Sequence, residues 1–158
     1  EGYPRPFRGV PSGGALYPLE LYFHSNRVEG LDAGLYHYSP ATNQVHLVTK
    51  GDQSRQLSNA LVQPEIATNN GLIIFITALF ERSVFKYKER GYRFVLLEAG
   101  HVAQNINLVA NAMNLAALNI GGFLDRRIDD LLGIDGLCHG TLYLVAIGRE
   151  SQEESTDS

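Results

Sequence analysis

Short alternating and apolar runs along the chain predict a β-sheet. Residues 19–24 alternate in part and are rich in aromatic side chains, which is typical of a strand. Residues 34–38 and 44–48 are also β-prone, and the five turn-forming residues between them predict a hairpin. Residues 72–80 are apolar on both faces, which indicates a central strand covered from two sides. Further strands are expected over 117–123 and 141–147.

Helical spacing marks three other segments. The longest, over about 92–114, carries a stripe of mostly small residues: Leu96, Gly100, Ala103, Asn107 and Ala110. Small residues on one stripe allow another helix to approach closely. A short helix is expected over 54–62. A third is expected over 126–132, capped by Asp125 and closed by Gly133.

The order of these elements favours an α+β fold. Hairpin strands come before most of the helices, and strands and helices do not alternate strictly, as they would in a doubly wound sheet. A chain of 158 residues predicts a single domain, which we assign to residues 1–149. Residues 1–18 are rich in Gly and Pro and are expected to form an extended loop, whereas the acidic residues 150–158 are expected to be disordered.

Composition excludes several classes of function. The chain has 13 basic and 17 acidic side chains, so its net charge of −4 leaves no electrostatic footprint for nucleic acid. Its single cysteine, Cys138, excludes an internal disulfide, and the scattered histidines lack ligand spacing, so no metal is expected. The longest apolar run, 72–80, is too short to cross a bilayer, and no signal-peptide pattern is present. We therefore expect a soluble, cytoplasmic protein that does not bind a membrane.

Two glycine-bearing segments could bind a ligand. The first consists of Pro11, Ser12, Gly13 and Gly14. It offers backbone N–H groups for close approach and a hydroxyl donor, although a plain turn before a strand is the more ordinary explanation. The second consists of Ile120, Gly121 and Gly122, at the end of an expected strand. Its amides could face the edge of an aromatic cofactor, although a strand-to-helix connection would use the same glycines.

A basic loop that carries tyrosine is expected over 85–93, and it contains Lys86 and Tyr87. A lysine near an oxidised ring can stabilise negative charge, and a partly buried lysine or tyrosine can relay a proton. A solvated charged loop would contain the same residues. Three polar residues also share one side of the long helix, namely Glu98, His101 and Asn105. Such residues form a buried network more often than a catalytic set.

Taken together, these segments resemble the nitroreductase superfamily of FMN flavoproteins. More narrowly, they are similar to the peptide azoline oxidases known as SagB-type or McbC-type dehydrogenases. The matching segments are 11–18, 34–38, 86–93, 97–105, 119–123 and 144–148. Each segment alone is a weak signal, but they occur in the family's order and span nearly the whole chain, from Arg8 to Arg149.

The resemblance implies a mixed β-sheet flanked by helices, with FMN bound at a homodimer interface and the long helix packed across the two-fold axis. In this family the loop matching Pro11–Gly14 contacts the flavin, and the loop matching Ile120–Gly122 supplies backbone contacts near its reactive edge. The pair matching Lys86 and Tyr87 marks members that oxidise thiazolines or oxazolines to thiazoles or oxazoles. The flavin accepts a hydride while a base removes the adjacent proton, and either Lys86 or Tyr87 could be that base.

This sequence departs from the family pattern at the flavin phosphate. Superfamily members usually begin with a helix that carries an arginine-rich, phosphate-binding stretch, and this sequence starts after that point. We therefore expect a truncated or processed domain, or one that borrows phosphate contacts, with Arg5, Arg8 and Arg149 as substitutes. The expected partners are a second copy, a modified peptide and a cyclodehydratase complex. Two alternatives stay open: an NAD(P)H-dependent nitro or quinone reductase, and a flavin-free scaffold subunit of a peptide-modifying complex.

Overall fold

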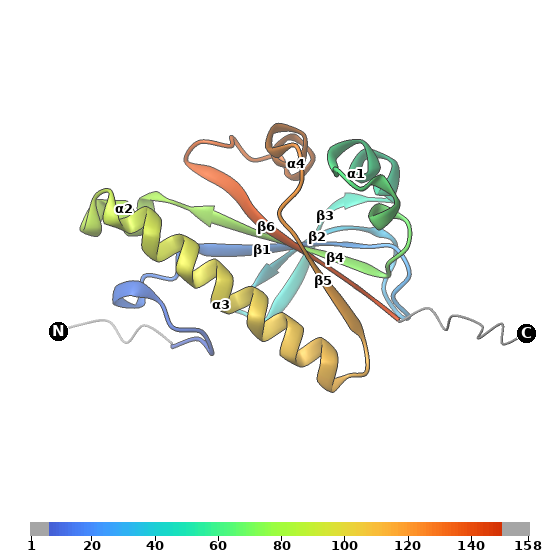
Figure 1. Cartoon of the computed structure of the whole chain (residues 1–158), viewed down its shortest axis with the longest axis horizontal. Coiled ribbons are helices and arrows are strands. Elements are labelled where there is room, and N and C mark those ends of the chain that lie inside the picture. The colour runs from blue at the N-terminus through green and yellow to red at the C-terminus, as the bar shows by residue number, and fades with distance from the viewer. Residues whose placement is uncertain (1–6, 150–158) are drawn as a thin grey trace, which may run out of the picture.

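The computed structural model describes residues 7–149, which fold around one six-stranded β-sheet with the strand order β3-β2-β1-β4-β6-β5 (Figure 1). The strands are β1 (Leu19–Ser25), β2 (Gly34–Ser39), β3 (Gln44–Lys50), β4 (Leu72–Leu79), β5 (Ala116–Ile120) and β6 (His139–Gly148). The α-helices are α1 (Ser54–Ala60), α2 (Glu81–Tyr87), α3 (Arg90–Ala112) and α4 (Asp125–Leu132). Two short 3₁₀ helices, η1 (Gly13–Ala15) and η2 (Pro64–Ala67), complete the described chain.

The α+β class is confirmed, but the sheet is not mixed. Every strand pairing within residues 7–149 is antiparallel. The reason lies in where the last strand inserts. Strands β4 and β5 both run antiparallel to β6, so they share a direction, but β6 lies between them and keeps them from pairing. Strand β1 separates β2 from β4 in the same way.

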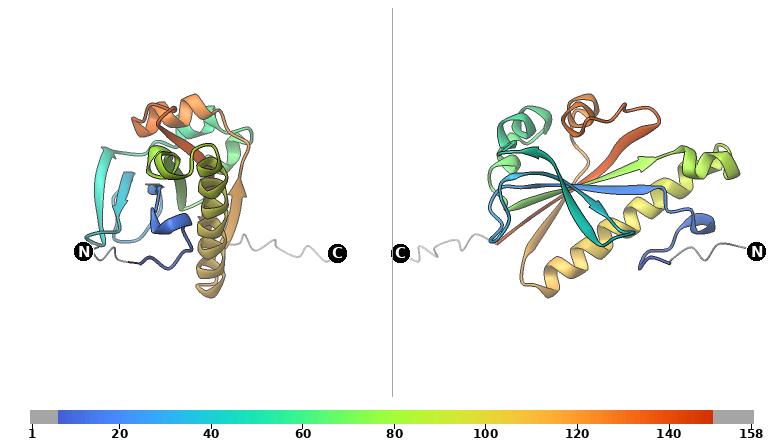
Figure 2. Two further views of the ribbon diagram at one scale, coloured as in Figure 1. Left: turned by 90° about the vertical axis from the view of Figure 1, so that its left-hand side faces the viewer. Right: turned by 180° about the vertical axis from the view of Figure 1, so that it is seen from behind.

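Helices cover both faces of the sheet and produce three layers (Figures 1 and 2). On one face α3 contributes Val95, Ala99 and Ala103 to a core with Ile76 and Val145 of the sheet. The opposite face is covered by α1, η2 and α4, whose apolar residues surround the central strands. The largest members of that core are Phe75, Leu35, Leu57, Ile73, Ile128 and Leu144, all fully buried. The expectation that residues 72–80 form a strand covered from two sides is thus confirmed.

The stripe of small residues on the long helix does not face another helix within the described chain. Ala103 and Ala110 are only 2% and 3% exposed, and Ala103 packs on the chain's own sheet. Leu96, which belongs to the same predicted stripe, is 57% exposed. For Ala103 the interpretation was wrong, because a helix needs small residues to lie close to a sheet, just as it does to lie close to another helix.

The predicted loop over 85–93 is instead a corner between two helices. Helix α2 ends at Tyr87, Lys88 adopts a left-handed φ of +52°, and α3 begins at Arg90. The corner is tight, since a Cβ added at Gly91 would lie 3.0 Å from the backbone of Val84. Sequence periodicity missed α2 because seven residues are too few to show an apolar stripe at helical spacing, and within α2 Ser83 is the one buried residue.

The ends of α4 were predicted in part. Gly133 takes the left-handed conformation, with φ of +71°, and closes the helix as expected. Asp125 is the first helical residue, and Leu124 occupies the capping position, so the predicted cap is wrong by one residue. The acidic segment 150–158 and Arg5 lie outside the described residues.

Two global findings bear on the classes of function considered from the sequence. Across residues 7–149, helices long and apolar enough to cross a membrane are absent. The same part of the chain contains no group of three or more His, Cys, Asp or Glu residues placed to hold a metal ion.

Candidate functional site

The segment that leads from Pro11 into β1 has an unusual backbone. Gly14, Ala15 and Tyr17 all have positive φ, at +66°, +54° and +48°. Side chains other than glycine reach this region at a cost of about 1–3 kcal/mol each, and such strain clusters at functional sites. The Ser12 hydroxyl stabilises the segment by accepting a 2.9 Å hydrogen bond from the Tyr17 backbone N–H.

Lys86 and Tyr87 of α2 lie against this strained segment. A Cβ built on Gly14 would overlap the Tyr87 hydroxyl and lie 3.1 Å from Lys86 Nζ. Beneath them Phe94 of α3 packs edge-on to the Tyr87 ring, with centroids 4.9 Å apart, and lies 3.1 Å from a Cβ built on Gly13. The expected catalytic pair and the first glycine segment therefore meet at one place, although they are far apart in the sequence.

A buried carboxyl group supports the same segment from below. Glu98 of α3 is 3% exposed, and burial raises the pKa of its carboxyl group, although a hydrogen bond with Ser12 and the charge of Arg8 lower that pKa in part. Ser12 thus accepts from Tyr17 and donates toward Glu98. The interpretation of Glu98 as part of a buried network is supported, whereas Asn105 is exposed and donates to the Gly9 carbonyl at 3.1 Å.

Arg8 is held against this segment from the other side. Its guanidinium lies 4.9 Å from the centre of the Tyr17 ring, and its backbone N–H donates to the Tyr17 hydroxyl at 3.0 Å. Arg8 and Glu98 both line a cavity of about 410 Å³ beside the strained segment, to which Tyr38 of β2 also contributes. The sequence-predicted ligands Arg8, Ser12 and Gly14 are therefore close together.

The second glycine segment lies elsewhere. Ile120 is 6% exposed and belongs to the core on the α1 and α4 face of the sheet. Gly122 accepts a 3.0 Å hydrogen bond from the Val62 N–H, and a Cβ added to Gly122 would lie 3.4 Å from the Val62 side chain. The Pro11–Gly14 segment packs on α3, on the opposite side of the sheet (Figure 1). Within one chain the two predicted flavin-contacting segments do not form a single site.

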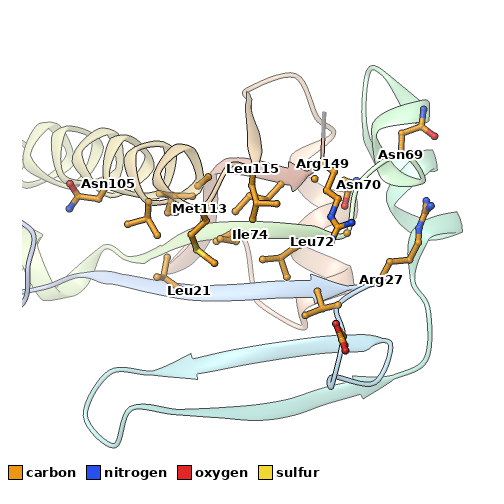
Figure 3. Close-up of a pocket in the computed structure, with 18 of the residues that line it drawn as sticks. Leu21, Arg27, Asn69, Asn70, Leu72, Ile74, Asn105, Met113, Leu115 and Arg149 are labelled. Carbon is orange, nitrogen blue, oxygen red and sulfur yellow. The ribbon is translucent and has the colours of Figure 1, made fainter. Parts of the chain in front are cut away.

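Arg149 is also separated from the first segment. It lies at one end of a groove of about 900 Å³ between the C-terminal half of α3 and the sheet, together with Arg27 (Figure 3). Apolar side chains such as Ile74 and Met113 line the body of this groove. Within residues 7–149, Arg8 and Arg149 line different cavities, so the structure does not bring the two expected phosphate ligands together.

Sequence reasoning missed a charged cluster beside the site. Glu20 of β1 pairs with Arg82 of α2 at 2.5 Å and with Nε2 of His37 at 2.9 Å. Burial alone would raise the pKa of the Glu20 carboxyl group, but the hydrogen bonds from His37 and Arg82 outweigh burial and lower it. The available signal was alternation in β1, because Glu20 shares a strand face with the fully buried His24.

Comparison with known proteins places this geometry in a family. The model of the nitroreductase family matches residues 7–149. The chain belongs to the nitroreductase family. The Methanocaldococcus jannaschii protein MJ1384, named as a nitroreductase, is 34% identical over 146 residues, which cover 92% of this chain and 72% of that protein. The expected family and its fold are thus confirmed.

Two further matches concern peptide processing. The Escherichia coli microcin B17-processing protein McbC is 34% identical over 133 residues, and the match covers 81% of this chain but only about half, 49%, of McbC. The structure of the E. coli microcin synthetase McbBCD complex with truncated pro-MccB17 bound matches with a TM-score of 0.79 and 27% identity. This match covers 94% of the chain and 57% of the matched chain. The narrower resemblance to McbC-type proteins is confirmed as well.

Proposed function

We propose that the chain is the oxidase domain of an FMN-dependent enzyme that dehydrogenates thiazoline or oxazoline rings in a modified peptide. The observation that carries this proposal is the contact of Lys86 and Tyr87 with Gly14. A site for this reaction needs a side chain that takes a proton beside the surface where the flavin binds. The similarity to McbC, a microcin-processing protein, supports a peptide as the substrate.

The residues around Gly14 fit a bound flavin. Gly14 is exposed and left-handed, and its missing Cβ leaves room for the Tyr87 hydroxyl and Lys86 Nζ. A flat ring bound on this segment would therefore lie beside both groups. Ser12 and Arg8 provide a hydroxyl group and a positive charge on the same segment. FMN, when bound, would accept the hydride that leaves the azoline ring. Pro11, Ser12, Gly13 and Gly14 would contact the flavin, and Arg8 would be available for its phosphate.

The chain's own part in the reaction is removal of a proton. Lys86 Nζ lies 5.1 Å from the centre of the Tyr87 ring, and both groups lie beside Gly14. Either Lys86 Nζ or Tyr87 Oη would take the proton from the carbon next to the one that loses the hydride. The ring thereby loses two hydrogens and becomes aromatic. Phe94, packed against the Tyr87 ring, limits the motion of that ring.

A homodimer would complete the flavin site. The segment Pro11–Gly14 packs on α3, whereas Ile120 belongs to the core on the opposite face of the sheet, which supports a flavin site that takes the two segments from two chains. The outward face of α3 offers the surface for such an interface, because Leu96, Leu97 and Leu108 are each 56–60% exposed. Arg149 of the second chain would then be a further candidate for the phosphate. A complex with a cyclodehydratase is the expected setting, and the match to the microcin synthetase McbBCD complex supports association with a peptide-modifying complex.

Three assays separate this proposal from its alternatives. The purified protein is incubated with FMN, desalted and examined for flavin absorbance, and a colourless product supports a flavin-free scaffold. The flavin-loaded protein is then offered a thiazoline peptide under oxygen, and oxidation of the ring supports the oxidase. Reduction of the flavin by NADPH with turnover of menadione, and no change in the thiazoline peptide, would instead establish a reductase.

A further inference from the structure

The side chain of Arg82 links helix α2 to the sheet. Arg82 lies one helical turn before Lys86, and its Nη1 atom contacts two acceptors. It pairs with Glu20 Oε1 of β1 at 2.5 Å and donates to the Tyr17 carbonyl oxygen at 3.4 Å. Tyr17 is also the residue whose N–H is held by Ser12. Arg82 therefore contacts both the sheet and the strained segment that ends at β1.

The acceptor on the sheet is itself held firmly. The Glu20 side chain is 13% exposed, and its second carboxylate oxygen contacts His37 Nε2 of the neighbouring strand at 2.9 Å. Its backbone carbonyl accepts a 3.2 Å hydrogen bond from the Thr77 hydroxyl of β4. Glu20 is thus held through its carboxylate by β2 and through its backbone by β4. A charged acceptor of this kind makes a stronger hydrogen bond than a neutral one.

Apart from Arg82, helix α2 is held at its two ends and by the packing of Tyr87 on Phe94. It spans seven residues, a length that is not stable as an isolated helix. Its start is tied by the Phe80 N–H to the Cys138 carbonyl at 3.1 Å, and its end turns directly into α3. Between these ends Ser83 is the one residue of α2 that is buried, so the apolar contribution of α2 to the core is small.

We propose that Arg82 and Glu20 are positioning residues that hold α2 at the angle which places Lys86 and Tyr87 on Gly14. This inference rests on the proposed oxidase function only for its effect on the reaction rate. The Arg82–Glu20 pair, which we call the clamp, is a property of the fold. Both contacts are made by the one Nη1 atom of the guanidinium. A lysine at this position keeps the positive charge on a different side-chain stem, so Arg82→Lys shows how much of the effect the charge alone supplies.

The test compares Arg82→Met, Arg82→Lys and Glu20→Gln with Arg126→Met, which removes an exposed ion pair with Asp130 on α4. In flavin-loaded protein, Arg82→Met is expected to lower kcat for a thiazoline peptide by about 10- to 100-fold, since displacement by an ångström costs up to that much. The KM of Arg82→Met is expected to stay nearly unchanged. The kcat values of Arg82→Lys and Glu20→Gln are expected to lie between those of Arg82→Met and the parent, and the kcat of Arg126→Met is expected to equal that of the parent.

A double-mutant cycle shows whether Arg82 acts on the rate through Lys86. Adding Arg82→Met to Lys86→Ala is expected to slow the reaction little further, because the group that Arg82 positions is already absent. Independent, multiplied losses would overturn the positioning role. So would an Arg82→Met variant that is slowed only through KM.

Hydrogen exchange tests the clamp without any turnover. In Arg82→Met the amides of residues 83–87 are expected to exchange on the order of tenfold faster, while those of the α3 centre keep the parent rate. Unchanged exchange in α2 would overturn the clamp. If exchange rises as expected but the parent does not oxidise a thiazoline peptide, the clamp stands and the proposed function fails.

Discussion

Replacement of Gly14 by alanine probes the contact on which the account depends. The residue has φ of +66°, and a left-handed conformation costs a residue with a Cβ about 1–2 kcal/mol. For a domain of this size each kcal/mol lowers Tm by about 2–4 °C, so Gly14→Ala is expected to lower Tm by about 2–8 °C. Gly133→Ala is the matched control, because Gly133 has φ of +71° and within the described chain a Cβ there meets open space. Both variants carry the cost of a left-handed backbone at alanine, but only in Gly14→Ala does the new methyl group lie in the candidate site.

The difference between these two variants measures the site. The new methyl group at Gly14 would overlap the Tyr87 hydroxyl and lie 3.1 Å from Lys86 Nζ. Because the Tyr87 ring lies against Phe94, the hydroxyl moves only if the ring turns or α2 shifts. A displacement of this order costs about 10²-fold in rate. Tm is measured by circular dichroism and turnover with a thiazoline peptide, and equal turnover by Gly14→Ala and Gly133→Ala would refute the placement of the pair.

Three further variants test the electrostatics and the expected dimer. Burial raises the pKa of the Glu98 carboxyl group above its ordinary 4.5, so the charged carboxylate destabilises the native state at neutral pH. Glu98→Gln should therefore have a higher Tm than the parent at pH 7.5, and a difference in Tm that does not shrink toward pH 4.5 would contradict this cause. Burial lowers the pKa of the His24 imidazole below 6.5, so the Tm of the parent should fall as the pH drops below that value. In His24→Gln this fall in Tm should be smaller, and an unchanged dependence of Tm on pH would exclude His24 as its source. The double variant Leu97→Glu with Leu108→Glu should sediment as monomers without flavin, whereas Leu137→Glu, at a leucine that is 82% exposed and lies off α3, should not; a dimer that survives both α3 changes places the interface elsewhere.

The sequence was most informative where the residues of a single helix or strand determine its structure. The apolar run of β4 and the left-handed Gly133 follow from local chemistry, and both were predicted. The small residues at Ala103 and Ala110 were ambiguous, because close packing on a sheet and close packing on a helix select the same side chains. Helix α2 was taken for a loop, since a short helix held by tertiary contacts leaves no apolar period to detect.

Candidate residues were named one by one from the sequence, but which of them lie together was not predicted. Ser12, Gly14, Lys86 and Tyr87 were all nominated from the sequence, and the structure brings them together. Their meeting depends on how the α2–α3 corner folds back over η1, which no local spacing encodes. Glu20 was overlooked because its partner, Arg82, is distant in the sequence, and a lone carboxylate in a strand gives no indication of a partner.

The most direct measurement is the rate at which flavin-loaded variants of the pair remove two hydrogens from a thiazoline peptide, followed by mass spectrometry. Lys86→Ala and Tyr87→Phe are expected to stay folded and yellow while the rate falls by ~10²–10⁴-fold, the usual contribution of a positioned acid or base. Lys88→Ala, a charged neighbour at the helix corner, is expected to keep the rate of the parent. An equal loss of rate in Lys88→Ala would mean that the loss comes from the positive charge of the α2–α3 corner as a whole. Full activity in both Lys86→Ala and Tyr87→Phe would contradict the oxidase assignment itself.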